Sequence, residues 1–153
     1  MQGRCVVRAL AVLVLLSCLS LSPLPAAAAD ETASSLPQAD RDAIHAVIEG
    51  QLDALRGDDA SAAFAFASPG IQTQFGDAAT FLDMVRRGYA PVYHPRSHAF
   101  GPLVKMEGRT VQKLDVIGPD GQRALALYVM EQQSDGSWRI SGCMLTESDS
   151  VGA

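Results

Sequence analysis

Two closely spaced turn signals near the end of this 153-residue chain constrain its fold most strongly. The first is Gly118-Pro119-Asp120-Gly121, where proline presets φ and the final glycine supplies the positive φ that a tight turn needs. The second, Ser134-Asp135-Gly136-Ser137, follows the apolar run 124–130 and precedes Trp138-Arg139-Ile140. Turns of this kind between apolar segments indicate β-hairpins. We therefore predict an antiparallel meander with strands at 98–106, 110–117, 123–133 and 138–145.

Side-chain alternation along the last strand predicts which residues share a face. Strict alternation places Trp138, Ile140, Gly142 and Met144 on one face and Cys143 on the other. Gly142 would also help the sheet to bend opposite the long third strand.

The segment before the strands shows helical periodicity. One helical face carries the apolar residues at 44, 47, 48, 52 and 55, with Gln51 on the same face. Ser35 is a candidate cap for this helix, and Gly57 ends it. Shorter helices are predicted at 60–67 and 78–87, with a connector at 71–75 and irregular chain at 89–95. The predicted fold class is α+β, with three N-terminal helices packed on one face of a curved four-strand antiparallel sheet.

The first 29 residues have the pattern of an export signal. Arg4 and Arg8 provide a positive start, residues 10–16 are apolar, and the alanines at 26–29 offer a cleavage site. We predict cleavage after Ala29 and a periplasmic or secreted protein with no stable membrane span. A bacterial lipoprotein attached through Cys18 is the rival interpretation.

The predicted organisation is a signal peptide at 1–29, a flexible tether at 30–36, a single domain at 37–147 and a tail at 148–153. The formal net charge is −5, and removal of Arg4 and Arg8 makes the domain more acidic. An acidic domain without a basic cluster argues against nucleic acid as a partner.

Cysteine and histidine usage gives no indication of a disulfide, a metal or a cofactor. Cys143 stays alone once the signal peptide is removed, so no intrachain disulfide can form. A buried, inert thiol is the expected state, with a reactive thiol or an interchain bridge as alternatives. No Cys/His pair has zinc-like spacing, and the histidines are His45, His94 and His98.

Three short motifs resemble the DUF4864 group, a domain of unknown function found in exported bacterial proteins. They are Phe66-Ala67-Ser68-Pro69-Gly70-Ile71-Gln72, Tyr89-Ala90-Pro91-Val92-Tyr93 and Trp138-Arg139-Ile140-Ser141-Gly142-Cys143. The resemblance covers about 37–145. It implies an NTF2-like, cone-shaped fold with a pocket between the helices and the sheet. It implies no activity, and the fold alone does not define one.

Four residues are candidates for binding a ligand in such a pocket: Gln51, Phe64, Tyr93 and Tyr128. Gln51 is the polar residue on an apolar helix face. It either hydrogen-bonds a ligand, a water or a strand backbone, or lies at the edge of the apolar stripe. Tyr128 shares a face with Ala126 and Met130, where a core tyrosine is the alternative to a donor in a site.

An enzyme of isomerase or lyase type would need a base and a donor facing each other in the pocket. His94 or Asp115 is the candidate base, and Tyr93 or Tyr128 the candidate donor. His94 is also compatible with an exposed loop, and Asp115 with the solvent face of a strand.

Three functions therefore compete. The leading hypothesis is a non-catalytic exported domain that binds a small apolar ligand or a protein partner. The others are the isomerase or lyase and a structural homodimer built through the sheet.

Overall fold

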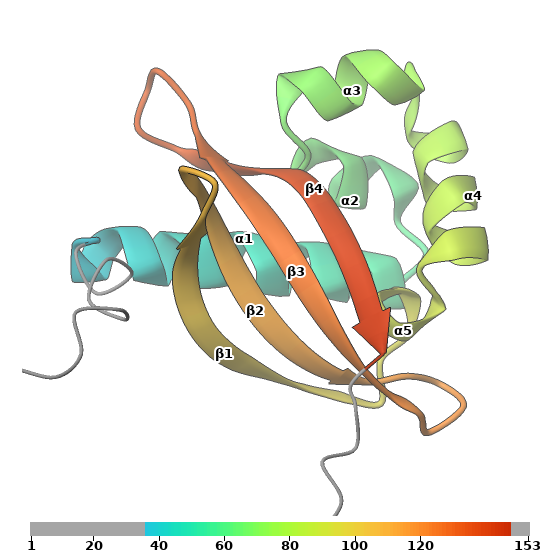
Figure 1. Cartoon of the computed structure of the whole chain (residues 1–153). Coiled ribbons are helices and arrows are strands. Elements are labelled where there is room, and N and C mark those ends of the chain that lie inside the picture. Colours follow the sequence, from blue (N-terminus) through green and yellow to red (C-terminus); the bar gives the residue numbers. More distant parts are fainter. Residues whose placement is uncertain (1–35, 148–153) are drawn as a thin grey trace, which may run out of the picture.

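The computed structural model describes residues 36–147, in which helices precede an antiparallel sheet (Figure 1). The helices are α1 (Gln38–Arg56), α2 (Ala60–Ala65), α3 (Pro69–Phe75), α4 (Ala78–Gly88) and α5 (Ala90–Tyr93). The strands are β1 (Ser97–Met106), β2 (Arg109–Ile117), β3 (Arg123–Gln132) and β4 (Trp138–Glu147), paired in the order β1-β2-β3-β4. The predicted α+β class and the four-strand meander are confirmed.

Several predictions fall on other parts of the chain. The signal peptide, its cleavage after Ala29, the Ser35 cap and the tail at 148–153 lie outside the described residues. Of the predicted tether at 30–36, Leu36 is described, and it packs against the main core.

Helix α1 crosses the sheet behind the strands, and α2, α3 and α4 gather beyond the β4 edge (Figure 1). Ile44, Ile48 and Leu52 are completely buried against the inner sheet face, which contributes Leu114 and Tyr128. Burial of each such aliphatic side chain stabilises the fold by about 1.5–3 kcal/mol. The predicted apolar face of this helix is therefore the face that forms the core.

Hydrogen bonds tie the first turn of α1 to the far end of the sheet. The indole Nε1 of Trp138 donates to Asp40 Oδ1 at 3.0 Å, and the amide of Gln132 donates to the same oxygen at 3.4 Å. Because the helix is rigid, this contact and the apolar face together fix its direction across the strands.

Two predicted irregular segments are helical instead. The connector at 71–75 belongs to α3, whose N-cap Ser68 accepts a hydrogen bond from the Ile71 amide and whose first position is Pro69. A Ser-Pro pair can begin a helix as readily as it ends one, because proline at the first position has no amide to satisfy. The irregular chain at 89–95 contains α5. The described residues thus hold five helices instead of the predicted three.

The predicted second helix is shorter than expected, because α2 ends at Ala65. The following residues add to the sheet: Ala67 forms a parallel bridge with Ile140. The Ile140 amide donates to the Phe66 carbonyl, and the Ser68 amide donates to the Ile140 carbonyl, at 2.9 and 2.8 Å.

A β-bulge in β4 overturns the predicted face alternation. Val129 pairs with Gly142 and Met130 with Ile140, so Ser141 is the extra residue. Beyond it the faces exchange, because one inserted residue moves every later side chain to the other face. Cys143 therefore faces the core side, and Met144 is 45% exposed.

A second irregularity lies in β1 between Phe100 and Leu103. The completely buried Gln112 donates its amide to the carbonyls of Gly101 and Lys113, at 2.7 and 2.8 Å. His45 stacks on Phe100 with ring centroids 3.9 Å apart. The two hydrogen bonds from Gln112 satisfy backbone carbonyls at the irregularity.

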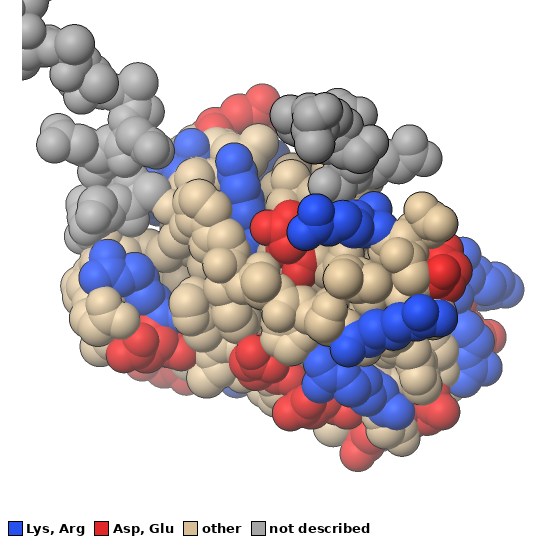
Figure 2. Space-filling view, turned by 90° about the horizontal axis from the view of Figure 1, so that it is seen from below, with Lys and Arg blue, Asp and Glu red and all other residues tan. Residues whose placement is uncertain are grey.

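Charged side chains of both signs are interspersed on the lower face of the molecule (Figure 2). No helix in the described range 36–147 combines the length and the apolar character needed to cross a membrane.

Gly50 is the point at which α1 meets the Phe66 ring. A Cβ at this position would lie 2.4 Å from the ring Cζ, so the ring would have to move. The backbone of Phe66 is held by its hydrogen bond from Ile140, which limits that movement. Glycine in a helix interior costs about 1 kcal/mol relative to alanine, and here the close approach requires it.

We predict that Gly50→Ala lowers the free energy of unfolding in urea, because an overpacking cost of about 1–3 kcal/mol exceeds the gain in helix propensity. Gly88→Ala is the matched control. Gly88 ends α4 with open space around it, so alanine there should leave stability unchanged or raise it. A Gly50→Ala protein as stable as the wild type would show that Phe66 does not require the glycine.

Candidate functional site

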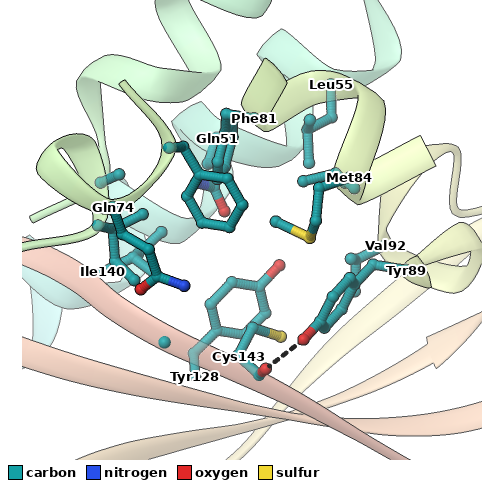
Figure 3. Close-up of a pocket in the computed structure, with 15 residues that line it drawn as sticks. Gln51, Leu55, Gln74, Phe81, Met84, Tyr89, Val92, Tyr128, Ile140 and Cys143 are labelled. Atoms are coloured by element: carbon teal, nitrogen blue, oxygen red, sulfur yellow. Dashed lines mark hydrogen bonds between the residues drawn. The ribbon is translucent and has the colours of Figure 1, made fainter. Parts of the chain in front are cut away.

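A pocket of about 190 Å³ lies between the helices and the β4 side of the sheet (Figure 3). Its walls come from α1, α3, α4, α5, β3 and β4. The residues labelled in Figure 3 are Gln51, Leu55, Gln74, Phe81, Met84, Tyr89, Val92, Tyr128, Ile140 and Cys143. Most of these side chains are apolar, as in sites that hold small molecules.

The hydrophobic core does not fill the pocket, because α3 and α4 do not pack closely against the sheet here. Helix α3 buries none of its residues, yet its Ile71 and Phe75 form one wall of the pocket. Phe81 and Val85 of α4 are buried in a second apolar cluster together with Leu55, and the α3 residues pack against this cluster. The pocket is thus the space left between this second cluster and the main core cluster.

Tyr128 provides the buried polar atom of the pocket. Its hydroxyl points toward the centre of the cavity (Figure 3), and it has no hydrogen-bond partner among residues 36–147. Burial, with a smaller contribution from nearby Cys143, raises the pKa of Tyr128 well above its ordinary value. The hydroxyl therefore remains neutral and able to donate a hydrogen bond. A buried polar group without a partner costs about 1–3 kcal/mol.

Gln51 is buried within the apolar face of α1, with 5% of its surface exposed. Its side-chain amide donates to the Ala63 carbonyl of α2 at 3.3 Å. The interpretation that it lies at the edge of the stripe is therefore wrong. The hydrogen-bond partner of its amide is a helix carbonyl and not a strand backbone group. The remaining side-chain oxygen faces the pocket (Figure 3).

Cys143 reaches the pocket only because of the bulge at Ser141. Burial raises the pKa of its thiol to about 12. At neutral pH the thiol is protonated, and a protonated thiol is a poor nucleophile and metal ligand. The Tyr89 hydroxyl donates to the Cys143 carbonyl at 3.1 Å, which attaches the start of α5 to β4.

The structure brings only two of the predicted ligand-binding residues into the pocket, namely Gln51 and Tyr128. Phe64 packs one layer away, with its ring centroid 5.3 Å from that of Phe81. Tyr93 directs its hydroxyl to Asp58 at the surface. Neither residue lines the cavity.

The residues predicted for acid–base catalysis do not converge. His94 lies 3.3 Å from an oxygen of Asp58, outside the pocket, and Asp115 is exposed on β2. Both positions agree with the surface interpretations given to them from the sequence. No group of three or more His, Cys, Asp or Glu side chains within 36–147 is arranged to hold a metal ion.

Sequence reasoning missed most of the pocket wall. Gln74, Met84 and Cys143 were not predicted as site residues, although all three line the cavity. Of these, Met84 could have been found from the helical periodicity of 78–87, because it lies three residues after Phe81. Cys143 could not, because nothing in the sequence marks the bulge.

Residues 37–153 match the sequence profile of DUF4864, a domain of unknown function. The chain belongs to the DUF4864 family. The motifs that resembled this family at 66–72, 89–93 and 138–143 all contribute residues to the pocket or to its attachment to the sheet.

Among solved structures, the chain is similar to ActVI-ORFA from Streptomyces coelicolor, with 17% identity and a TM-score of 0.45. The similarity covers 76% of this chain and all of that one. No curated protein matches the chain.

The DUF4864 domain also carries a polar cluster around Asp58, in the turn between α1 and α2. The carboxylate accepts a hydrogen bond from the Tyr93 hydroxyl and lies 3.3 Å from His94 Nε2. Arg86 stands over the Tyr93 ring and donates to its hydroxyl at 3.2 Å. The cluster joins the α1–α2 turn to α4 and α5, two helices that line the pocket.

The Tyr93 hydroxyl, followed by His94, holds the pKa of Asp58 below its ordinary value of 3.8. The folded state therefore favours the charged carboxylate. The resulting stabilisation is present above the ordinary pKa and is lost as the pH falls through the lowered one.

We predict that Asp58→Asn lowers the urea midpoint at pH 7 and that its difference from the wild type shrinks as the pH falls below 3.8. Asparagine suits this test because Asp58 has a φ of +55°, a conformation that asparagine tolerates. Asp115→Asn, at an exposed position on β2, is the control and should leave the urea midpoint unchanged both at pH 7 and at low pH. Equal midpoints for Asp58→Asn and wild type at pH 7 would contradict the prediction.

Proposed function

We propose that this domain binds a small, largely apolar ligand in the pocket between its helices and β4. The observation that carries the proposal is a cavity of about 190 Å³ with the unpartnered Tyr128 hydroxyl directed into it. Protein interiors are close-packed and seldom retain voids much larger than a water molecule. A ligand that fills the cavity would restore the missing contacts and give the hydroxyl a partner.

The chemistry of the lining favours binding over catalysis. An isomerase or lyase needs a base with a pKa near the working pH. The ionisable groups that line the pocket are Tyr89, Tyr128 and Cys143. Burial raises the pKa of both Tyr128 and Cys143, so neither acts as a base at neutral pH. His94 and Asp115 would have to leave their surface positions to take part.

We place the entrance to the pocket beside α3, because this helix contributes an exposed residue to the pocket lining. Gln74 is an exposed residue of this helix, and its side-chain amide is directed toward Tyr128 (Figure 3). A ligand that enters the pocket would pass this side chain. An enlarged side chain at the same position should close the entrance without changing the core.

We predict that native mass spectrometry of the protein from the periplasm of its own host detects a retained ligand, and that Gln74→Trp abolishes the adduct. The indole would occupy the entrance beside Tyr128. Thr73→Trp adds the same indole to the adjacent, exposed position of α3 outside the pocket, and should retain the ligand. Loss of the adduct in both variants, or its presence in both, would argue against this site.

The same preparation tests the export that we propose for this protein. Cleavage after Ala29 predicts a mature chain that begins at Asp30. A lipid-modified Cys18 at the N-terminus would support the lipoprotein alternative instead.

A second candidate role is homodimerisation through the outer face of the sheet. Val111, Leu127 and Val129 form an apolar cluster on that face and are already buried within the monomer, whereas Met144 beside Leu127 is 45% exposed. Burial of the exposed Met144 side chain against a second copy would be favourable.

If the outer face forms a dimer, Met144→Lys should convert it to a monomer in light-scattering measurements, because a buried lysine would lack a partner. A monomeric wild-type protein at high micromolar concentration would exclude this role. The result is independent of whether the pocket holds a ligand.

A further inference from the structure

We infer that the ligand of this pocket is an uncharged molecule, of about the size of a single ring with a short substituent, that carries a hydrogen-bond acceptor for the Tyr128 hydroxyl. The inference rests on the binding function proposed above and specifies the chemical class of the ligand. It follows from the charge, the polar groups and the size of the cavity.

The absence of charge in the wall excludes charged ligands. None of the described residues that line the pocket is Asp, Glu, Lys, Arg or His. A carboxylate or an ammonium group in this pocket would lose its hydration without gaining a counter-ion. A neutral molecule has no such loss.

Two other polar groups of the wall are already engaged as donors, and a third, the amide of Gln74, belongs to an exposed residue that water can reach. The Tyr89 hydroxyl donates to the Cys143 carbonyl at 3.1 Å, and the Gln51 amide donates to the Ala63 carbonyl at 3.3 Å. Among the buried side-chain nitrogen and oxygen atoms of 36–147, the Tyr128 hydroxyl is the one without a hydrogen-bond partner. A carbonyl or ether oxygen of the ligand would accept it.

The size of the cavity limits the body of the ligand. An apolar protein cavity of about 150 Å³ accepts benzene. The present pocket, at about 190 Å³, therefore suits one ring with a substituent of a few atoms. The rings of Phe81 and Tyr89 and the side chain of Met84 supply apolar contacts around it (Figure 3).

Acetophenone and ethylbenzene provide a matched pair of probes, because they have nearly the same shape but only the ketone carries an acceptor. Isothermal titration of the protein without its natural ligand should show tighter binding of acetophenone. In Tyr128→Phe the acetophenone affinity should fall roughly three- to tenfold, the value of one hydrogen bond, while that of ethylbenzene stays the same or rises. Benzoate should bind neither protein.

Tyr89→Phe is the control variant. It removes a hydroxyl from the same pocket, but one that already donates to a backbone carbonyl. It should preserve the preference for acetophenone over ethylbenzene. Tyr128→Phe removes a hydroxyl that has no partner in 36–147, so the variant should fold at least as stably as the wild type in urea.

The outcomes separate the ligand class from the binding function. Equal affinities for the two probes, unchanged in Tyr128→Phe, would overturn the inference about the acceptor while leaving pocket binding intact. Benzoate binding as tight as that of acetophenone would overturn the inference that the ligand is uncharged. Failure of both neutral probes to bind the wild-type protein would overturn the proposed function together with the inference.

Discussion

The contact between one face of α1 and the inner face of the sheet supports the rest of the structure. Ile44, Ile48 and Leu52 are completely buried there, and Asp40 accepts the indole hydrogen of Trp138 at the end of the same helix. The close approach of Gly50 to Phe66 then brings the segment after α2 onto β4. The positions of the other helices follow from their connections to α1 and the sheet.

The pocket is a consequence of that arrangement. Helices α2 and α4 form their own apolar cluster around Phe81, and α3 connects them without burying any residue. Because these helices lie beyond the β4 edge, they cannot close on the sheet as tightly as α1 does (Figure 1). The space that remains contains Tyr128, a residue that the sheet itself places at the centre of β3. A buried hydroxyl in such a space is retained at a cost to stability, which is typical of functional sites.

The polar residues divide into those that hold the fold and those that face the cavity. Gln112 pairs with the backbone carbonyls at the β1 bulge, and Asp58 gathers Tyr93 and His94 at the surface. Both sets are satisfied within the domain. Tyr128 is not, and this difference distinguishes the pocket from the surface clusters that also contain titratable residues.

The sequence by itself determined the long helix, the strands that follow the helices and the fold class, but not the short helices α3 and α5. Helical periodicity over 44–55 and the glycine-containing turns at 118–121 and 134–137 are local signals. Such signals can be recognised within one segment, without knowledge of the tertiary contacts. They gave the long helix, the meander and the α+β class. The resemblance of three short motifs led to the DUF4864 family, which the profile match over 37–153 confirms.

Only the tertiary structure decided which residues share the pocket. Ser141 becomes a bulge because Ile140 and Gly142 each keep a partner on β3, and this pairing turns Cys143 inward. Tyr93 and Phe64 do not line the pocket as predicted. The Tyr93 hydroxyl donates to Asp58, and the Phe64 ring packs against Phe81. Such choices depend on contacts between segments far apart in the chain, and alternation or periodicity within one segment carries no information about them.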